Sequence, residues 1–580
     1  MKKKGYGKLL SQLMVYVRPH RTVFYLSVIF DLLAIVLNML IPTFSGLAID
    51  TMIEVGNVDI YLLIRYVLII LVFTVTSSVF DWLGSHYMNV LTYKTSQSIR
   101  NSIYSKLNNV PIRYIDNTPH GEIMNTMIND VENVTDGFLA GFKSIVCGVF
   151  QILTIMVLML VLNWKLALLV IVVAPFSLIV ALWINKRSQK LYQARVETQG
   201  VLSGYSEEMI TNMKIIKAFN DEENTVDKFE KINEDMYKAS EKSMFYATLA
   251  YPAARFINGL LYVAVGALGT VLAMQGQIGI GKISSFLSYS DNFTKPFNDI
   301  SSIFADLNIA VASANRVFSL LNEENEISDQ NLPVMKKCNG EVKLKDVSFS
   351  YEESFKLIEN LNLDVKQGQR VAIVGPTGCG KSTIINLLMR FYDVNKGSIR
   401  VSGKDIRKVK RNSFRQFYGM VLQESWLYNA SVRDNVAYGK PNAGMDEIIE
   451  ACKLANAHAF IEKLPNGYDT IITERGDNIS AGQKQLLCLA RIMLLRPPMM
   501  ILDEATSNID TRTEMKIQEA LNILMEGRTC FIVAHRLSTI ENADVILVMN
   551  KGHIVEQGKH QDLLAKKGFY YELFNSQFGS

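Results

Sequence analysis

The chain has 580 residues, more than one ordinary domain holds, so we expect at least two folding units. Hydrophobic residues make up 49% of it and the mean hydropathy is positive, which excludes an all-soluble protein and indicates a membrane-embedded first half. Its 60 Lys and Arg residues against 56 Asp and Glu residues leave a formal charge of +4, so charge predicts no nucleic-acid partner. The six cysteines have no CxxC or metal-ligand spacing and five lie in the polar second half, which we expect to be reduced and cytosolic.

Six stretches of the first half are candidate membrane spans, since about 20 apolar residues cross a hydrocarbon core of about 30 Å. The first four are continuous apolar runs, whereas the last two are less apolar and the sixth contains Asp291, Lys295 and Asp299. The predicted spans lie near residues 23–49, 60–90, 138–162, 165–185, 247–274 and 281–307.

The loops between these spans differ in basic residues, which are retained on the cytoplasmic side of a membrane. The segments 54–59, 163–165 and 275–282 are short and poor in Lys and Arg, while those near 94–113 and 186–217 are long and rich in them. Both chain ends are therefore predicted to be cytoplasmic. The helical patterning of the two long loops indicates that membrane helices continue into the cytoplasm.

Residues 323–340 are polar and rich in turn-forming residues, which is typical of a linker. The alternation of Val342, Leu344, Val347 and Phe349 then opens a soluble domain. We expect an all-α polytopic membrane domain (1–322) with long cytoplasmic helical extensions, the linker, and an α/β nucleotide-binding domain of the phosphate-loop type (341–580).

Several polar side chains lie within the predicted spans, where charge in contact with lipid is costly. They should face protein or water, and either a substrate cavity or helix pairing would explain them. These residues are Asp31, Asn38, Asp81, Arg255, Asp291 and Lys295.

The strongest motif is the sequence Gly-Pro-Thr-Gly-Cys-Gly-Lys-Ser at 375–382, a GxxxxGK[ST] phosphate-binding loop between the apolar strand 371–374 and the helix 383–388. In such a loop backbone N–H groups surround phosphate oxygens, Lys381 neutralises the β- and γ-phosphates, and the Ser382 hydroxyl binds Mg²⁺. A chance glycine turn is disfavoured because strand and helix are both in place. The nucleotide-binding candidates here are Gly375, Thr377, Gly378, Cys379, Gly380, Lys381, Ser382 and Thr383.

A second apolar strand, 499–502, ends in Asp503 and Glu504. Beside a phosphate loop, the first carboxylate would hold Mg²⁺ and the second would polarise the attacking water as a general base. Such a pair on its own is usually only the exposed end of a strand.

Between these motifs, Ile-Ser-Ala-Gly-Gln at 479–483 opens an apolar helix. This pentapeptide resembles the LSGGQ signature of ATP-binding-cassette proteins. The order of phosphate loop, signature and Leu-Asp-Glu-Ala-Thr-Ser (502–507) is similar to that family, and the resemblance covers nearly the whole chain. It implies that Ser480, Ala481, Gly482 and Gln483 contact the ATP held by a partner chain.

The resemblance implies four further site residues, of which Tyr351 could instead be a packing residue and His535 a structural one. Tyr351 would stack on adenine, and Gln423 would touch Mg²⁺ and sense the membrane domain. Asp510 would face the opposite nucleotide site, and His535 would contact the γ-phosphate. The expected catalytic set is Glu504, His535, Lys381 and Gln423, and the expected metal set is Ser382, Gln423 and Asp503.

Other segments resemble exporters rather than importers. Residues 473–476 resemble an exporter-specific segment before the signature, and 111–121 resemble the first coupling helix, although Thr126 stands where many relatives carry arginine. In the membrane half, segments that also resemble exporters lie at 164–169, 216–219 and 314–318.

Ala481 replaces the first glycine of the signature, which adds a methyl group and restricts φ, while the hydrolytic residues are intact. Such asymmetry resembles a heterodimeric exporter, in which this chain would supply the hydrolytic side. A homodimer that tolerates alanine is the alternative.

The sequence thus predicts an ATP-hydrolysing exporter subunit that moves a drug, lipid or peptide-like substrate by alternating access, with ATP and Mg²⁺ as cofactors. We expect a multi-pass protein of a bacterial plasma membrane, paired with a second half-transporter. An ATP-gated channel or a non-transporting sensor could use the same parts. A soluble cassette machine is disfavoured by the membrane domain, and a peptide exporter with its own protease by the lack of a Cys/His unit before the first span.

Overall fold

The structure is a computed structural model that describes residues 4–52, 58–352, 356–422, 425–473, 478–503, 510–534 and 540–578. Its contacts divide the chain into two compact units. One comprises Met1–Val110 and Thr118–Glu324, and the other Pro111–Asn117 and Asn325–Ser580. The short segment Pro111–Asn117 therefore packs with the second unit, although it lies within the first in sequence.

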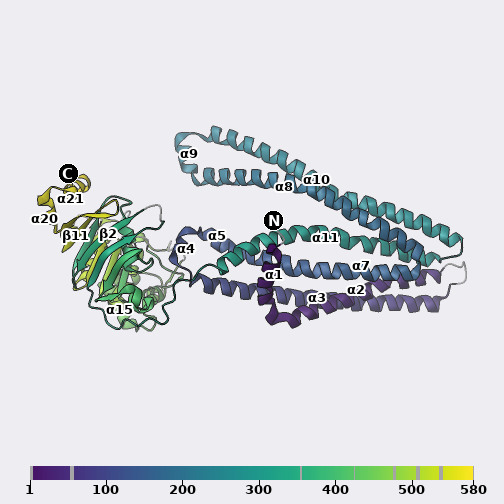
Figure 1. Cartoon of the computed structure of the whole chain (residues 1–580), viewed down its shortest axis with the longest axis horizontal. Helices are drawn as coiled ribbons and strands as arrows, with labels where there is room; N and C mark the ends of the chain where they lie inside the picture. The colour runs from purple at the N-terminus through teal and green to yellow at the C-terminus, as the bar shows by residue number, and fades with distance from the viewer. Residues whose placement is uncertain are drawn as a thin grey trace. The chain divides into compact units, whose positions relative to one another are not determined.

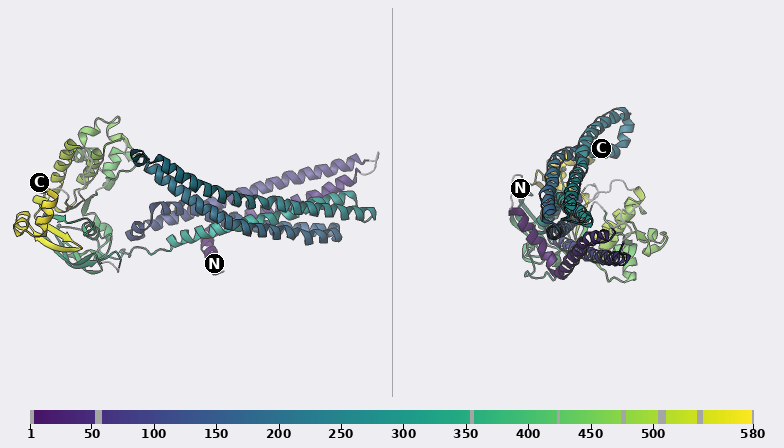
Figure 2. Two further views of the ribbon diagram at one scale, coloured as in Figure 1. Left: turned by 90° about the horizontal axis from the view of Figure 1, so that it is seen from above. Right: turned by 90° about the vertical axis from the view of Figure 1, so that its right-hand side faces the viewer.

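The first unit consists of long helices (Figure 1). Helix α3 has 48 residues, so at 1.5 Å per residue it is roughly 70 Å long, more than twice the thickness of a hydrocarbon core. Helices α8 and α10 lie side by side and are joined at one end by α9 (Figures 1 and 2). The bounds are α1 Lys4–Val17, α2 Arg21–Asp50, α3 Ile60–Leu107, α5 His120–Asn125, α6 Val131–Thr135, α7 Gly141–Leu162, α8 Trp164–Thr211, α9 Met213–Phe219, α10 Glu222–Met274 and α11 Ile280–Leu321, with π-helical turns η2 (Thr126–Asp130) and η3 (Asp136–Ala140) around α6.

Among the described residues, 4 helices are long and apolar enough to cross a membrane: Leu9–Asp50, Ile60–Leu107, His120–Leu162 and Arg255–Met274. The expected fourth span lies in α8, which begins with the apolar stretch Trp164–Phe176. Helix α11, which contains the expected sixth span, is not one of the four. Charged residues such as Lys282, Asp291 and Lys295 lower the mean hydropathy of this helix.

Helices α2 and α11 approach closely because small residues meet between them. A Cβ atom on Gly46 would lie 2.4 Å from the carbonyl oxygen of Gly281, so a larger residue would push the two backbones apart. The amide of Gly281 donates to Asp50 Oδ1 (2.7 Å), and Tyr289 Oη donates to Met39 O (2.7 Å). Polar contacts thus fix the relative positions of two helices that are far apart in sequence.

The second unit is an α/β domain whose central sheet has 6 strands in the order β12-β11-β3-β10-β9-β6. Strands β11, β3, β10, β9 and β6 are parallel, and β12 pairs antiparallel at the edge. A second sheet has the order β2-β1-β4-β5. The strands are β1 Val342–Phe349, β2 Ile358–Val365, β3 Arg370–Val374, β4 Lys396–Val401, β5 Lys404–Asp405, β6 Tyr418–Val421, β7 Ala430–Ser431, β8 Ile471–Ile472, β9 Met499–Asp503, β10 Thr529–Val533, β11 Val545–Asn550 and β12 His553–Gly558.

The central strands are buried except at Arg370, which begins β3, and Asp503, which ends β9, as expected of a parallel sheet covered on both faces. The α-helices found in the described part of this unit are α4 Ile112–Asn117, α12 Lys381–Leu388, α13 Arg411–Arg415, α14 Val432–Val436, α15 Met445–Leu454, α16 His458–Ile461, α17 Ala481–Leu495, α18 Thr511–Met525, α20 His560–Lys566 and α21 Phe569–Phe578. The predicted fold class, a helical membrane domain fused to an α/β nucleotide-binding domain, is confirmed.

Candidate active site

The phosphate loop lies between β3 and α12 and has glycine at three positions with positive φ, one of which is Gly378 (φ +79°). Gly375 has φ +156°, and a Cβ there would lie 2.3 Å from the carbonyl oxygen of Met549 and 2.8 Å from Cys379 Sγ. Gly380 has φ +103°, a left-handed conformation, at the position before α12. The loop is therefore held in a shape that only glycine allows, at the N-terminus of a helix, where backbone N–H groups favour anions.

Lys381 lies at the first position of α12, and its side chain folds back over the loop. Its Nζ donates to the carbonyl oxygens of Gly375 (2.8 Å) and Pro376 (3.1 Å). Thr377, Gly378 and Ser382 are exposed beside it. The Lys381 ammonium thus lies next to the solvent-exposed side of the loop, an arrangement that can bind the phosphate groups of a nucleotide.

Cys379 and Thr383 are the buried members of this segment. Burial raises the pKa of the Cys379 thiol, so this side chain stays protonated at neutral pH and contributes packing, while its backbone belongs to the loop. Thr383 accepts a hydrogen bond from Tyr351.

The carboxyl ends of four parallel strands meet at one edge of the central sheet. Register places Val533 of β10 opposite both Ile373 of β3 and Asp503 of β9, and Leu502 opposite Val421 of β6. The phosphate loop follows β3, so Asp503 ends its strand at the same edge. The predicted residues Gln423, Glu504 and His535 follow β6, β9 and β10 in sequence, but all three lie outside the described residues.

Tyr351 lies beside α12. Its hydroxyl donates to Thr383 Oγ1 (3.4 Å) and accepts from Asn386 Nδ2 (3.1 Å). Its ring packs edge to face against Phe349 and Tyr392, at 4.9 Å in each case. This ring is one wall of a cavity of about 710 Å³, whose other lining residues include Arg113, Lys356, Asn395 and Lys396.

The signature residues begin another helix. Ser480 caps α17: its Oγ accepts from the amide of Gln483 (3.3 Å), and Gln483 Oε1 accepts from the amide of Ser480 (2.9 Å). Ala481 is the first residue of α17, is exposed, and has a negative φ. The expected conflict between alanine and the backbone is therefore absent at this position, and only the added methyl group distinguishes it from glycine. Gly482 is buried behind it.

Asp510 is the N-cap of α18. Its Oδ1 accepts from the amide of Thr513 (2.9 Å), and this hydrogen bond lowers the pKa of Asp510. The described contacts thus give Asp510 a helix-capping role.

The structure brings together the phosphate loop, Tyr351 and the end of β9, and it adds two residues that the sequence did not single out. Asn386 binds the Tyr351 hydroxyl, and Tyr392 packs on its ring. Neither belongs to a motif with a mechanism of its own, so only their position beside Tyr351 identifies them. The signature helix packs in a different hydrophobic cluster from that of α12.

The polar residues of the predicted spans have different environments. Asp31 is 4% exposed and forms an ion pair with Lys143 (2.9 Å). A Cβ on Gly84 of α3 would lie 2.1 Å from Asp31 Oδ1, so this glycine makes room for the carboxylate. Asp31 therefore serves helix pairing between α2, α3 and α7. Asp291 pairs with Lys295 on the exposed side of α11 (3.2 Å).

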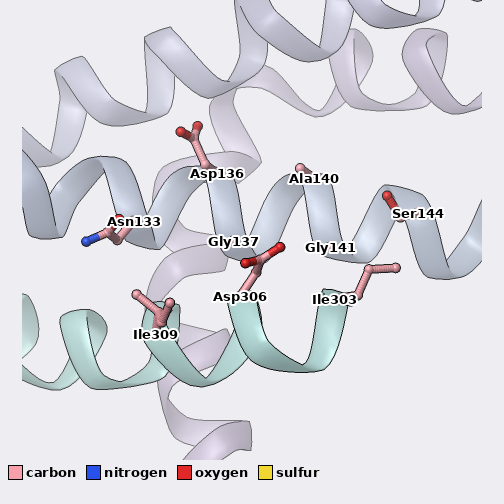
Figure 3. A pocket seen from close by; sticks show the side chains of 9 residues that line it. All are labelled: Asn133, Asp136, Gly137, Ala140, Gly141, Ser144, Ile303, Asp306 and Ile309. Atoms are coloured by element: carbon pink, nitrogen blue, oxygen red, sulfur yellow. The ribbon is translucent and has the colours of Figure 1, made fainter. Parts of the chain in front are cut away.

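A cavity of about 270 Å³ lies in the first unit between α11 and the helix formed by η3 and α7 (Figure 3). Gly137 and Gly141 form part of its wall, and Figure 3 shows the Asp306 side chain extending from α11 toward them. Its other lining residues are Asn133, Asp136, Ala140, Ser144, Ile303 and Ile309, which include none of the polar residues predicted in the spans.

Comparisons with known proteins agree with both units. Residues 24–297 match the ABC transporter transmembrane region and residues 358–507 match the ABC transporter family of ATP-binding domains. An uncharacterised ABC transporter ATP-binding protein of Bacillus subtilis is 37% identical over 98% of this chain and 94% of its own length. A fatty acid ABC transporter ATP-binding/permease protein of Mycobacterium bovis is 38% identical over 89% and 82%. The solved structure of a bacterial Atm1-family ABC exporter with ATP bound is 26% identical, covers 100% of both chains and has a TM-score of 0.75.

Proposed function

Since this chain belongs to the ABC transporter family, as an ATP-hydrolysing exporter subunit of the bacterial plasma membrane with its ATP-binding domain in the cytoplasm, we propose how its own residues perform the cycle. The observation that carries the proposal is the glycine-dependent loop at 375–382, with Lys381 folded over it at the sheet edge where β9 ends in Asp503. In this proposal the loop and the Lys381 ammonium bind the triphosphate of ATP, and Tyr351 stacks on the adenine.

Ser382, Gln423 and Asp503 would hold Mg²⁺, which neutralises phosphate charge when bound. Hydroxyl, amide and carboxylate oxygens are donors that Mg²⁺ accepts. Support comes from the exposed Ser382 at the start of α12 and from the strand register that ends Asp503 at the edge where the loop begins.

Glu504 would accept a proton from the attacking water, and His535 would hold the γ-phosphate. Support comes from sequence position, because Glu504 directly follows Asp503, the last residue of β9, and His535 comes shortly after Val533, the last residue of β10.

The test is Glu504→Gln in the purified transporter in lipid nanodiscs. We expect ATP affinity within about twofold of wild type and ATP turnover lowered by at least about 100-fold, the size of effect that a general base supplies. Near-wild-type turnover would remove Glu504 from this role.

We propose that the functional dimer pairs this chain with a different half-transporter. The support is Ala481, whose methyl group is exposed at the first turn of α17. In such a pair, this chain's phosphate loop works with the partner's signature. A chain that forms stable dimers with full ATPase activity when purified alone would refute the heterodimer.

For the cargo we propose a lipid-like amphiphile, within the wider class of drug, lipid or peptide-like molecules. The support is the name of the Mycobacterium bovis relative, a fatty acid ABC transporter. ATPase activity in nanodiscs should rise with oleate and not with a cationic dye or a short apolar peptide. Stimulation by the dye or the peptide alone would contradict a lipid cargo.

A further inference from the structure

Tyr392 lies between the ring of Tyr351, which would stack on adenine, and the short helix α4. Its ring is 4.9 Å from that of Tyr351 at an interplanar angle of 89°. Its hydroxyl donates to Asp116 Oδ2 of α4 (2.5 Å). All three residues belong to the same compact unit, and α4 is the segment that connects the long helix α3 to α5. One side chain therefore contacts both Tyr351, the proposed adenine-stacking residue, and the segment that connects α3 to α5.

The hydrogen bond from Tyr392 to Asp116 has a defined direction. Burial and the negative charge of Asp116 both raise the pKa of Tyr392, so the phenol stays protonated at physiological pH and is always the donor. Hydrogen bonds to a charged acceptor are shorter and stronger than those between neutral groups, as the 2.5 Å distance here reflects. Arg113, on the same helix, lines the cavity that Tyr351 borders.

At its other side, Tyr351 is attached to the phosphate-loop helix. Its hydroxyl contacts Thr383 and Asn386 of α12, and its ring packs edge to face on Tyr392. Close-packed rings cannot move independently, because a gap of even 0.5–1 Å loses much of their contact energy. A base that stacks on Tyr351 would therefore restrict Tyr392 as well.

We propose that Tyr392 is a positioning residue that transmits occupancy of the base position at Tyr351 to helix α4. The inference rests on the proposed function, which places adenine on Tyr351. A second route from the nucleotide to α4 would not involve Tyr351. Tyr392 follows the end of α12 by only a few residues, so phosphate binding at the start of α12 could move Tyr392 without the adenine. The two routes differ in whether the adenine of the nucleotide is needed to affect α4.

Hydrogen–deuterium exchange on the full transporter in nanodiscs separates them. We compare peptides 111–121 and 375–390 without nucleotide, with Mg²⁺ and a non-hydrolysable ATP analogue, and with Mg²⁺ and inorganic tripolyphosphate. The analogue should slow exchange in both peptides, whereas tripolyphosphate should slow only 375–390. Equal slowing of 111–121 by tripolyphosphate would overturn the route through Tyr351.

Tyr392→Phe keeps the ring and removes only the hydroxyl. We expect the analogue-induced slowing at 111–121 to fall by about tenfold, the size expected for one hydrogen bond to a charged group, with 375–390 unchanged. Asp116→Asn, which keeps a neutral acceptor, should give a smaller loss. The matched control is Tyr428→Phe, because that hydroxyl donates to Asp434 O (3.1 Å) elsewhere in the same unit, and it should change neither peptide.

An unchanged response at 111–121 in Tyr392→Phe would refute the role of Tyr392. If the analogue slowed 111–121 but not 375–390, the proposed phosphate site would be wrong and the inference would fall with it. If it slowed 375–390 but not 111–121, ATP binding would stand and only the inference would be refuted.

Discussion

Two helices of the ATP-binding unit begin at short glycine-containing motifs, and they begin in different ways. Helix α12 follows Gly380, whose φ of +103° requires glycine, whereas α17 follows Ser480, which caps it by reciprocal hydrogen bonds with Gln483. The start of α12 therefore depends on a backbone conformation, whereas the start of α17 depends on side-chain hydrogen bonds. The backbone at the start of α12 requires glycine, whereas the backbone at the start of α17 accepts Ala481 without strain, so only the exposed methyl group of Ala481 bears on the dimer.

The largest expected effect is Lys381→Ala in the phosphate loop. It removes the ammonium that lies over Gly375 and Pro376, and with it the charge that stabilises the transferring phosphate. We expect ATP turnover to fall by about 1,000-fold. Steady-state ATPase assays would measure it, and circular dichroism would confirm folding. Turnover within tenfold of wild type would mean that the position of Lys381 over the loop is not functional.

Gly375→Ala comes next. The new Cβ would lie 2.3 Å from the Met549 carbonyl oxygen, so the loop must shift. A strained backbone conformation costs about 1–3 kcal/mol, and the upper value corresponds to a loss of about 100-fold in ATP affinity. Isothermal titration calorimetry would measure this loss. Gly368→Ala is a control at a turn with positive φ and open space around it. Equal loss in the control would show that the effect is general backbone strain.

Ser480→Ala should have a smaller effect, on stability. It removes the acceptor of the Gln483 amide, and losing such a cap costs about 1 kcal/mol. Thermal unfolding monitored by intrinsic fluorescence would show a melting point lower by a few degrees. A Ser480→Thr variant should retain the cap, and failure of threonine to rescue would argue against capping as the cause.

Ala481→Gly should have the smallest effect, and it distinguishes the two dimers. In a heterodimer this signature faces the partner's site, so ATP turnover at this chain's own phosphate loop should change by less than about twofold. The substitution removes only a methyl group, because the backbone at 481 needs no glycine. A clear rise in turnover of this chain purified alone would instead indicate a homodimer limited by the methyl group.

Much of this site could be predicted because phosphate-loop chemistry uses contiguous residues. Lys381 and Ser382 must follow a glycine turn, and Asp503 must end an apolar strand, so spacing and hydrophobic pattern identify them. The polar residues in the spans show the limit of such patterns. Asp31 is explained by Lys143 and Gly84, on two other helices, and neither partner is visible from the sequence around Asp31.

The sequence by itself determined the class of protein, its two-part organisation and the phosphate loop, because these depend on local composition and on motifs of a few adjacent residues. Tertiary structure decided the rest. It alone showed that Ala481 has an ordinary helical backbone, that Pro111–Asn117 packs with the ATP-binding unit, and that Tyr392 joins Tyr351 to Asp116. A backbone angle or a contact between side chains is not written in the pattern of one segment. Tyr392 and Asp116, which share a hydrogen bond, are 276 residues apart, and only the fold brings them together.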